Sequence, residues 1–276
     1  MNYIEKNHPT YGKCLFADNG IIEIGIPLEF GLRIGHFSFV GGDNVFFEQP
    51  KDLKTFTTAE GWQIRGGHRL WLAPESGADY FPDNAPIQYK IDNDTVILTQ
   101  QKDPWLNVIK EIVLHFDENR MHVEHRVTNV GEDKCQCSLW AISSVAAGGK
   151  QTICFERRDN GYDPWHKISM WDYTNLGDPR VKYSRDEIVI THTPLDERDK
   201  IGVSHPYGPI KYENGNTIFL KNFQIHVDKK YPDGNMSYET FCGRYMMELE
   251  SLSPLFDVLP NQTVSHTEVW ELLKKS

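Results

Sequence analysis

The sequence is poor in cysteine and lacks the cysteine spacings that metal sites and redox motifs use. Its five cysteines include no Cys-x-x-Cys pair, and Cys135 and Cys137 lack the further ligands that a zinc site needs. Dispersed thiols of odd number are typical of a reducing compartment. The N-terminus has no apolar signal segment, and no stretch is long enough to span a bilayer. We therefore expect a cytoplasmic protein with no membrane partner.

Positive charge is also scarce. The chain of 276 residues has 29 Lys and Arg against 39 Asp and Glu, so its formal net charge is −10. Nucleic acids and anionic membranes are bound by basic surfaces, which neutralise their phosphates. This balance argues against a nucleic-acid partner.

Several common catalytic motifs are missing from the sequence. There is no His-Glu-x-x-His metalloprotease motif and no P-loop glycine pattern. A Gly-x-Ser-x-Gly nucleophile elbow is absent too, which excludes the commonest serine-hydrolase arrangement. No window of helical length shows an apolar period of 3.6, although single helical turns remain compatible with the pattern.

Strand signals, in contrast, cover most of the chain. Short apolar and β-branched runs alternate with turn residues, as in the hairpins 87–99 and 108–128. Further strands are expected at 134–144, 187–192, 217–227, 237–242, 245–252 and 266–273. The pattern has no repeat and no linker. It predicts an all-β fold of antiparallel strands in a single domain, residues 1–276, and leaves open whether this is a sandwich or a barrel.

The segment from Arg65 to Glu75, Arg-Gly-Gly-His-Arg-Leu-Trp-Leu-Ala-Pro-Glu, is the first candidate binding element. Two glycines allow close backbone approach, and His68, Arg69 and Trp71 follow at once. Arg and His donate to hydroxyl groups, while an indole packs against the C–H face of a sugar ring. The alternative is a structural bulge with a paired arginine and a core tryptophan.

The strand around 245–252 carries two alternating acids. Met247 and Leu249 share one face, whereas Glu248 and Glu250 share the other. If the apolar face packs on the core, the carboxylates project together, about 7 Å apart. One could then act as a base and the other as a hydrogen-bond acceptor. The alternative is a solvated edge strand, since exposed acids are common.

Turns and strand ends between residues 200 and 238 form the third candidate region. Lys200 stands two residues before Gly202, and Asp233 lies in a Tyr-Pro-Asp-Gly turn. Binding residues are often found on such loops. We therefore include Lys200 and Asp233 among the candidate ligand-binding residues.

Taken in order, these motifs resemble the galactose mutarotase-like (aldose 1-epimerase-like) superfamily, and most closely an uncharacterised bacterial branch of it. The resemblance covers the chain from about residue 20 onward. It rests on the 65–75 segment, on Val-Thr-Asn at 127–129 before a Trp-containing strand, and on the ending. That ending is Glu-x-Glu-Ser-Leu-Ser-Pro at 248–254, then Leu-Pro-Asn at 259–261 and His-Thr-Glu-Val-Trp at 266–270.

The resemblance implies an antiparallel β-supersandwich that binds a carbohydrate on its concave face. In mutarotases a histidine protonates the ring oxygen while a glutamate removes the proton from the anomeric hydroxyl, with no metal or organic cofactor. Glu248 matches the glutamate position, and Glu250 is the alternative register. The function implied is that of an aldose 1-epimerase.

One departure from the family pattern affects the acid. In mutarotases the histidine stands on the strand after the Val-Thr-Asn turn, whereas residues 137–144 contain Trp140 and no histidine. Either His68 replaces it or the protein binds sugar without catalysis. A glycosidase or lyase that uses Glu248 and Glu250 is a third possibility, although glycosidases place their carboxylates on opposite sides of the scissile bond.

The resemblance and the motifs together define one expected site. We expect one concave surface to gather Arg65, His68, Arg69, Trp71, Trp140 and Glu248.

Overall fold

The computed structural model describes residues 1–53, 61–80, 83–158, 161–162 and 164–275. The regular structure of these residues is almost entirely β, with 22 strands and one 3-10 turn, η1 (Gly77–Tyr80). This confirms the expected all-β class. Within the described residues no helix is both long and apolar enough to cross a membrane.

The strands form three sheets in which all pairings are antiparallel. A four-stranded sheet has the order β1 (Asn2–His8), β2 (Gly12–Asp18), β3 (Ile22–Pro27), β5 (His36–Phe39). A ten-stranded sheet has the order β14 (Val181–Tyr183), β15 (Glu187–Thr191), β12 (Lys150–Cys154), β17 (Ile210–Asn214), β18 (Thr217–Phe223), β22 (Thr263–Lys274), β10 (Arg120–Asn129), β9 (Val108–Asp117), β8 (Thr95–Thr99), β7 (Gln88–Asp92). An eight-stranded sheet has the order β13 (Ile168–Met170), β16 (Asp199–Val203), β19 (Tyr238–Cys242), β20 (Met247–Leu252), β11 (Cys135–Val145), β6 (Gly67–Ala73), β4 (Arg33–Ile34), and β21 (Phe256–Val258) pairs with β11.

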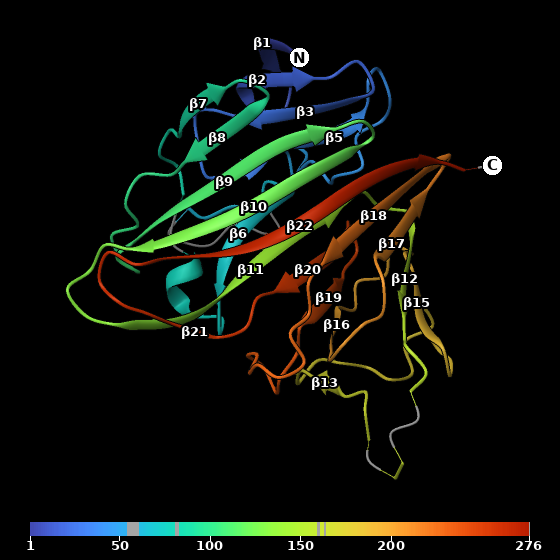
Figure 1. Ribbon diagram of the computed structural model, residues 1–276. Coiled ribbons are helices and arrows are strands. Elements are labelled where there is room, and N and C mark those ends of the chain that lie inside the picture. The colour runs from blue at the N-terminus through green and yellow to red at the C-terminus, as the bar shows by residue number, and fades with distance from the viewer. Residues whose placement is uncertain (54–60, 81–82, 159–160, 163, 276) are drawn as a thin grey trace.

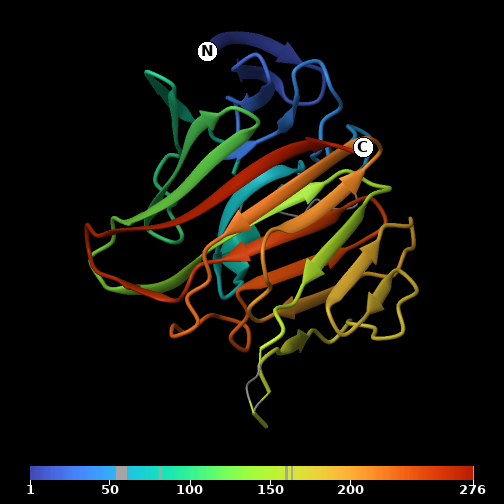
Figure 2. The same cartoon turned by 45° about the vertical axis from the view of Figure 1, so that its right-hand side comes forward.

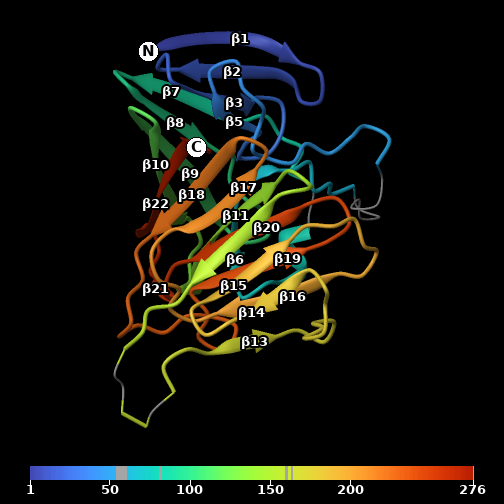
Figure 3. The ribbon, with the colours of Figure 1, turned by 90° about the vertical axis from the view of Figure 1, so that its right-hand side faces the viewer.

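The two larger sheets stack as the layers of a sandwich. In Figure 1 the long strands β9, β10, β22 and β18 lie in front of β6, β11, β20 and β19. The N-terminal sheet, blue in Figure 2, sits at one end of this sandwich. Figure 3 shows the second layer as the succession β11, β20, β19, β16 and β13. The sequence pattern left sandwich and barrel open, and the structure is the sandwich that the family resemblance implied.

Alternation along the long strands builds the core between the layers. On β9 and β10 every second residue is buried, as a strand with one face on a core requires. Ile112, Leu114, Val123 and Trp270 belong to this core. Each such side chain contributes about 1.5–3 kcal/mol when fully buried.

The middle strands of the second layer are buried on both faces. All seven residues of β6 are buried. Leu70 and Leu72 pack toward the interior with residues of β9 and β10. Trp71 and Trp140 belong to a separate apolar cluster on the other face. The ten-stranded sheet packs on the inner face only, so other segments of the chain bury the outer face. The candidate site lies on this outer face.

Candidate functional site

Strand register places the polar side chains of the outer face in rows. In the first row Trp71 of β6 lies beside Trp140 of β11. In the second row, two residues along each strand, Arg69 of β6 lies beside Ile142 of β11, which in turn lies beside Glu250 of β20. The next row contains Ser144, Glu248 and, through β19, Phe241 and Lys200. Because side chains alternate, members of these rows all point to the same face.

A cavity of about 270 Å³ opens over these rows. Five of the candidate residues line it: Arg69, Trp71, Trp140, Lys200 and Glu248. Met247 and Leu249 pack in the main core, which confirms the predicted alternation on β20. The structure therefore brings together five of the candidate residues from four different strands.

An ion pair between Arg69 and Glu248 forms part of the cavity wall. Arg69 Nη1 donates to Glu248 Oε1 at 2.9 Å, and the Ser144 hydroxyl donates to the same oxygen at 2.8 Å. The Arg69 guanidinium lies 4.6 Å from the centroid of the Trp71 ring. Among the described residues both bonds go to Oε1, so a ligand can approach the carboxylate through Oε2.

The second acid, Glu250, is used differently. It is buried, and its Oε2 accepts from Trp140 Nε1 at 2.9 Å and from Lys200 Nζ at 3.1 Å. Lys200 also pairs with Glu239 at 2.8 Å and lies 4.5 Å from the Trp140 ring centroid. Glu250 lies behind the cavity surface and positions two residues that line it, Trp140 and Lys200.

Burial controls the protonation of this cluster. It raises the pKa of Glu250, and it raises the pKa of Glu239 to about 8. Burial also opposes the charge on Lys200, but the two carboxylates outweigh it and raise the pKa of the ammonium. Lys200 thus stays cationic at neutral pH, whereas Glu239 readily holds a proton.

The rest of the wall comes from residues that the sequence did not single out. Trp62 and Tyr80 pack edge-to-face, with ring centroids 5.2 Å apart, and Tyr80 packs in the same way on Trp71. The remaining lining residues include Glu75, Tyr173, Arg198, Phe241 and Met246. Most lie in loops or at strand ends, where no periodic pattern marks them.

His68 lies on the opposite face of β6, inside the sandwich. It is 0% exposed, and its ring packs against Trp270 with centroids 4.7 Å apart. His68 Nδ1 is 2.8 Å from Ser143 Oγ, and Nε2 is 2.7 Å from His125 Nε2. Burial lowers its pKa well below the usual value. The expectation that His68 shares a surface with Glu248 is wrong, because neighbouring residues of a strand alternate between faces.

Arg65 and Asp233 also lie away from the cavity lining. Arg65 has a φ of 55° and stacks on Phe30, with its guanidinium 3.9 Å from the ring centroid, beside a different cavity. Asp233 has a φ of 54° in its turn, and its backbone carbonyl accepts from the Ser169 hydroxyl at 2.8 Å. Each has a structural role in its own turn.

The fold and the cavity can now be compared with known proteins. No protein-family model and no curated protein matches the chain. Among solved structures, a galactose mutarotase-like protein from Lactobacillus casei matches with a TM-score of 0.62 and 11% identity, covering 94% of this chain and 100% of that chain. A galactose mutarotase-like protein from Clostridium acetobutylicum matches with a TM-score of 0.60 and 12% identity, covering 99% and 98%. The fold is that of the galactose mutarotase-like proteins.

None of the described residues that line the cavity is a histidine. The possible proton donors there are Tyr80, Tyr173 and Lys200, and Tyr80 already donates to Glu75. Burial raises the pKa of Tyr173 to about 12 and raises that of Tyr80 as well. The phenols are therefore hydrogen-bond donors at neutral pH and weak acids.

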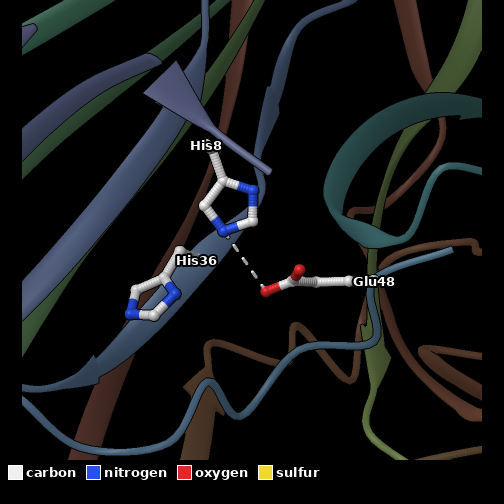
Figure 4. A group of neighbouring side chains, drawn as sticks. All are labelled: His8, His36 and Glu48. Atoms are coloured by element: carbon white, nitrogen blue, oxygen red, sulfur yellow. Dashed lines mark ion pairs between the residues drawn. The ribbon is translucent and has the colours of Figure 1, made fainter. Parts of the chain in front are cut away.

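Among the described residues, two groups of His and Glu side chains bring their ligand atoms within 4.8 Å of one another. Figure 4 shows the first, in which the Glu48 carboxylate points toward the rings of His8 and His36. The Thr10 amide donates to His8 Nδ1 at 3.2 Å, so the neutral ring carries its proton on Nε2. That nitrogen faces Glu48 at 3.7 Å. This distance is too long for a hydrogen bond, and with its proton in place the nitrogen lacks the lone pair that a metal ligand needs.

The second group, His68, His125 and Glu268, is fully buried. Lys221 Nζ lies 3.0 Å from Glu268 Oε1, so an ammonium already neutralises this carboxylate. His125 Nδ1 donates to the carbonyl of His266 at 3.0 Å, which leaves Nε2 to accept from His68. The hydrogen bonds satisfy these groups and tie the two layers together.

Proposed function

We propose that this chain binds a carbohydrate in the 270 Å³ cavity on the outer face of β6, β11 and β20. The observation that carries the proposal is the Arg69–Glu248 pair, set beside the indole rings of Trp71 and Trp140. A sugar ring presents apolar C–H faces and a rim of hydroxyls. Aromatic rings pack against the C–H faces, and a charged donor–acceptor pair forms hydrogen bonds with the hydroxyls.

The charge of the cavity supports an uncharged sugar. Arg69, Arg198 and Lys200 line it together with Glu75 and Glu248. Behind Lys200 lies a further carboxylate, Glu250, while Glu239 readily holds a proton. The cations are thus offset locally, and no surplus of positive charge remains to attract an anionic ligand.

A calorimetric screen of mono- and oligosaccharides tests this proposal, with Arg198→Ala and Arg185→Ala as a matched pair. Both arginines are exposed, but only Arg198 lines the cavity. We expect Arg198→Ala to weaken binding several-fold and Arg185→Ala to leave it unchanged. If no sugar binds the wild type, or if both variants bind alike, the cavity assignment is wrong.

Aldose 1-epimerase activity is the catalytic form of this proposal. Glu248 is a carboxylate of the cavity wall, paired with Arg69, and its position fits a base that accepts the anomeric proton. A protein of Escherichia coli reported as a candidate aldose 1-epimerase has the same fold, with a TM-score of 0.56, 10% identity, and coverage of 94% of this chain and 98% of that chain. The alternative is a binding or regulatory module that uses the same cavity without catalysis.

Glu248→Gln separates these two forms. The amide keeps the shape and an acceptor for Arg69 but cannot take a proton, so we expect sugar affinity to change by less than about tenfold, or 1.4 kcal/mol. Acceleration of anomer equilibration should fall by about 10²–10⁴. Polarimetry of fresh α-glucose and α-galactose measures this directly. A wild type that binds a reducing sugar but leaves equilibration at the buffer rate supports the binding module.

Glycosidase chemistry with the Glu248 and Glu250 pair is not favoured. Glu250 is 1% exposed and already accepts from Trp140 and Lys200. It cannot reach a scissile bond on the far side of a sugar, as the second carboxylate must.

We also propose a reducing, cytoplasmic setting for the protein. All five cysteines are free thiols in the structure, which fits such a compartment.

A further inference from the structure

A second cavity, of about 300 Å³, adjoins the first. Both cavities are lined by Trp62, Arg69 and Trp71, so a wall of three side chains is common to them. The 3-10 turn η1 lies between them, since Ala78 and Asp79 line the second cavity and Tyr80 lines the first. The loop that precedes β9, residues 100–105, forms the other side.

A buried carboxylate of the second cavity has an oxygen without a partner. Asp79 is 7% exposed, and its Oδ2 accepts from the backbone and the hydroxyl of Ser76 at 2.9 and 3.0 Å. Its Oδ1 is buried and makes no hydrogen bond with the described residues. Burial raises the pKa of Asp79. Buried polar atoms are normally paired, so a ligand hydroxyl that reaches Oδ1 would satisfy an atom that the described residues leave unpaired.

The charges of this cavity balance. Its cations are Arg69, Lys102 and Lys110, and its carboxylates are Asp79, Asp83 and Asp103. Lys110 is buried, with its Nζ 3.9 Å from Asp103. A neutral ligand that both donates and accepts hydrogen bonds suits such a lining better than an anion or a metal cation.

An aromatic side chain lies at the rim. Trp105 is 57% exposed and lines the same cavity. Exposed indoles at a polar cavity are effective surfaces for the C–H face of a sugar. Gln100 and Gln101, which can donate and accept, stand beside it in the lining.

We propose that the second cavity binds a second sugar residue of the same ligand, so that the ligand is an uncharged oligosaccharide of two or more residues. The inference rests on the proposed carbohydrate binding in the first cavity. One residue of the ligand packs on Trp71 and pairs with Arg69 and Glu248. The next crosses the shared wall, packs on Trp105 and donates a hydroxyl to Asp79.

Calorimetry with glucose, galactose, maltose, cellobiose and lactose tests the inference on the full chain. We expect at least one disaccharide to bind about tenfold more tightly than either monosaccharide. Trp105→Ala should remove most of that gain while monosaccharide affinity changes by less than about twofold. Gln101→Ala, a second exposed position of this cavity, should reduce the gain in the same direction. Tyr207→Ala is the control, because Tyr207 is 58% exposed and lies outside both cavities.

The outcomes separate the inference from the proposed function. If monosaccharides bind in the first cavity and disaccharides bind no more tightly, the second sugar position is refuted and carbohydrate binding stands. The inference is also overturned if Trp105→Ala weakens mono- and disaccharides equally, or weakens neither. If none of the five sugars binds the wild type, the proposed function itself fails.

Discussion

Replacing Lys221 with methionine removes a buried ammonium that joins the two large sheets. Lys221 is on β18, in the ten-stranded sheet, and is 0% exposed. Its Nζ donates to the carbonyls of Ala141 and Leu249, both at 2.8 Å, on β11 and β20 of the other sheet. It also pairs with Glu268 at 3.0 Å. Methionine has similar bulk but makes none of these bonds.

The expected loss follows from what Glu268 then lacks. Glu268 is 0% exposed, and it accepts from Trp270 Nε1 at 2.7 Å and from the Ser251 hydroxyl. Without Lys221 its charge is buried and unpaired, and breaking a buried pair in this way costs about 3–5 kcal/mol. Two carbonyls also lose their donor. Lys221→Met should therefore lower the free energy of unfolding by at least about 3 kcal/mol at pH 7.

Urea denaturation of wild type, Lys221→Met and Lys221→Met/Glu268→Gln tests this. The glutamine keeps an acceptor for Trp270 but carries no charge, so the double variant should recover a substantial part of the loss. An unpaired buried carboxylate binds a proton more readily in the folded state, so the loss relative to wild type should grow from pH 5 to pH 8. A loss below about 1 kcal/mol that is independent of pH would refute the reasoning.

Two further predictions concern the interior and the turn before β6. Burial holds the pKa of His125 and of His266 at about 3, so both are neutral when folded. The unfolded chain binds more protons between about pH 6.5 and pH 3, so the free energy of unfolding should fall as the pH is lowered through this range, by up to about 1.4 kcal/mol per pH unit for each histidine. Urea melts at pH 7, 6 and 5 measure this, and His125→Asn should reduce the slope; an unchanged slope contradicts the argument. Gly66 has a φ of 85°, and a Cβ there would collide with the carbonyl of Phe47, so Gly66→Ala should destabilise the fold by more than Gly208→Ala. Gly208 has a φ of 68° but open space around it, so it incurs only the conformational cost, on the order of 1–3 kcal/mol. Equal thermal shifts for the two variants would show that the collision is relieved.

The alternation of apolar and polar residues predicted most strands and the two acids of β20. The predicted hairpin 108–128 corresponds to β9 and β10, and the predicted strand 217–227 begins with β18 but ends at Phe223. The alternation of acids at Glu248 and Glu250 is also present, because Met247 and Leu249 pack in the core. A period of two is a local property, and sequence therefore reveals it.

The same period could have corrected the assignment of His68. Arg69 and Trp71 are two residues apart in β6 and both point to the outer face. In a regular strand His68, next to Arg69, must therefore point to the inner face. The expectation that Arg65 lines the same cavity is wrong for another reason. Arg65 and the following glycines have positive φ, so the chain turns before β6 begins and the side chain is carried away.

What the sequence could not predict depends on loops and on sheet stacking. Tyr80, Tyr173 and Arg198 reach the cavity from segments without periodicity. The separate roles of the two acids depend on partners distant in sequence. Arg69 is 179 residues from Glu248, and Lys200 is 50 residues from Glu250. No local pattern encodes such a pairing.

A crystal structure of the protein soaked with the tightest-binding sugar from the calorimetric screen tests the central claim most directly. We expect the sugar ring to pack against Trp71 or Trp140, with a hydroxyl within hydrogen-bonding distance, about 2.6–3.2 Å, of the Glu248 carboxylate. Sugar density at any other place on the molecule, with only water beside Glu248, would contradict it.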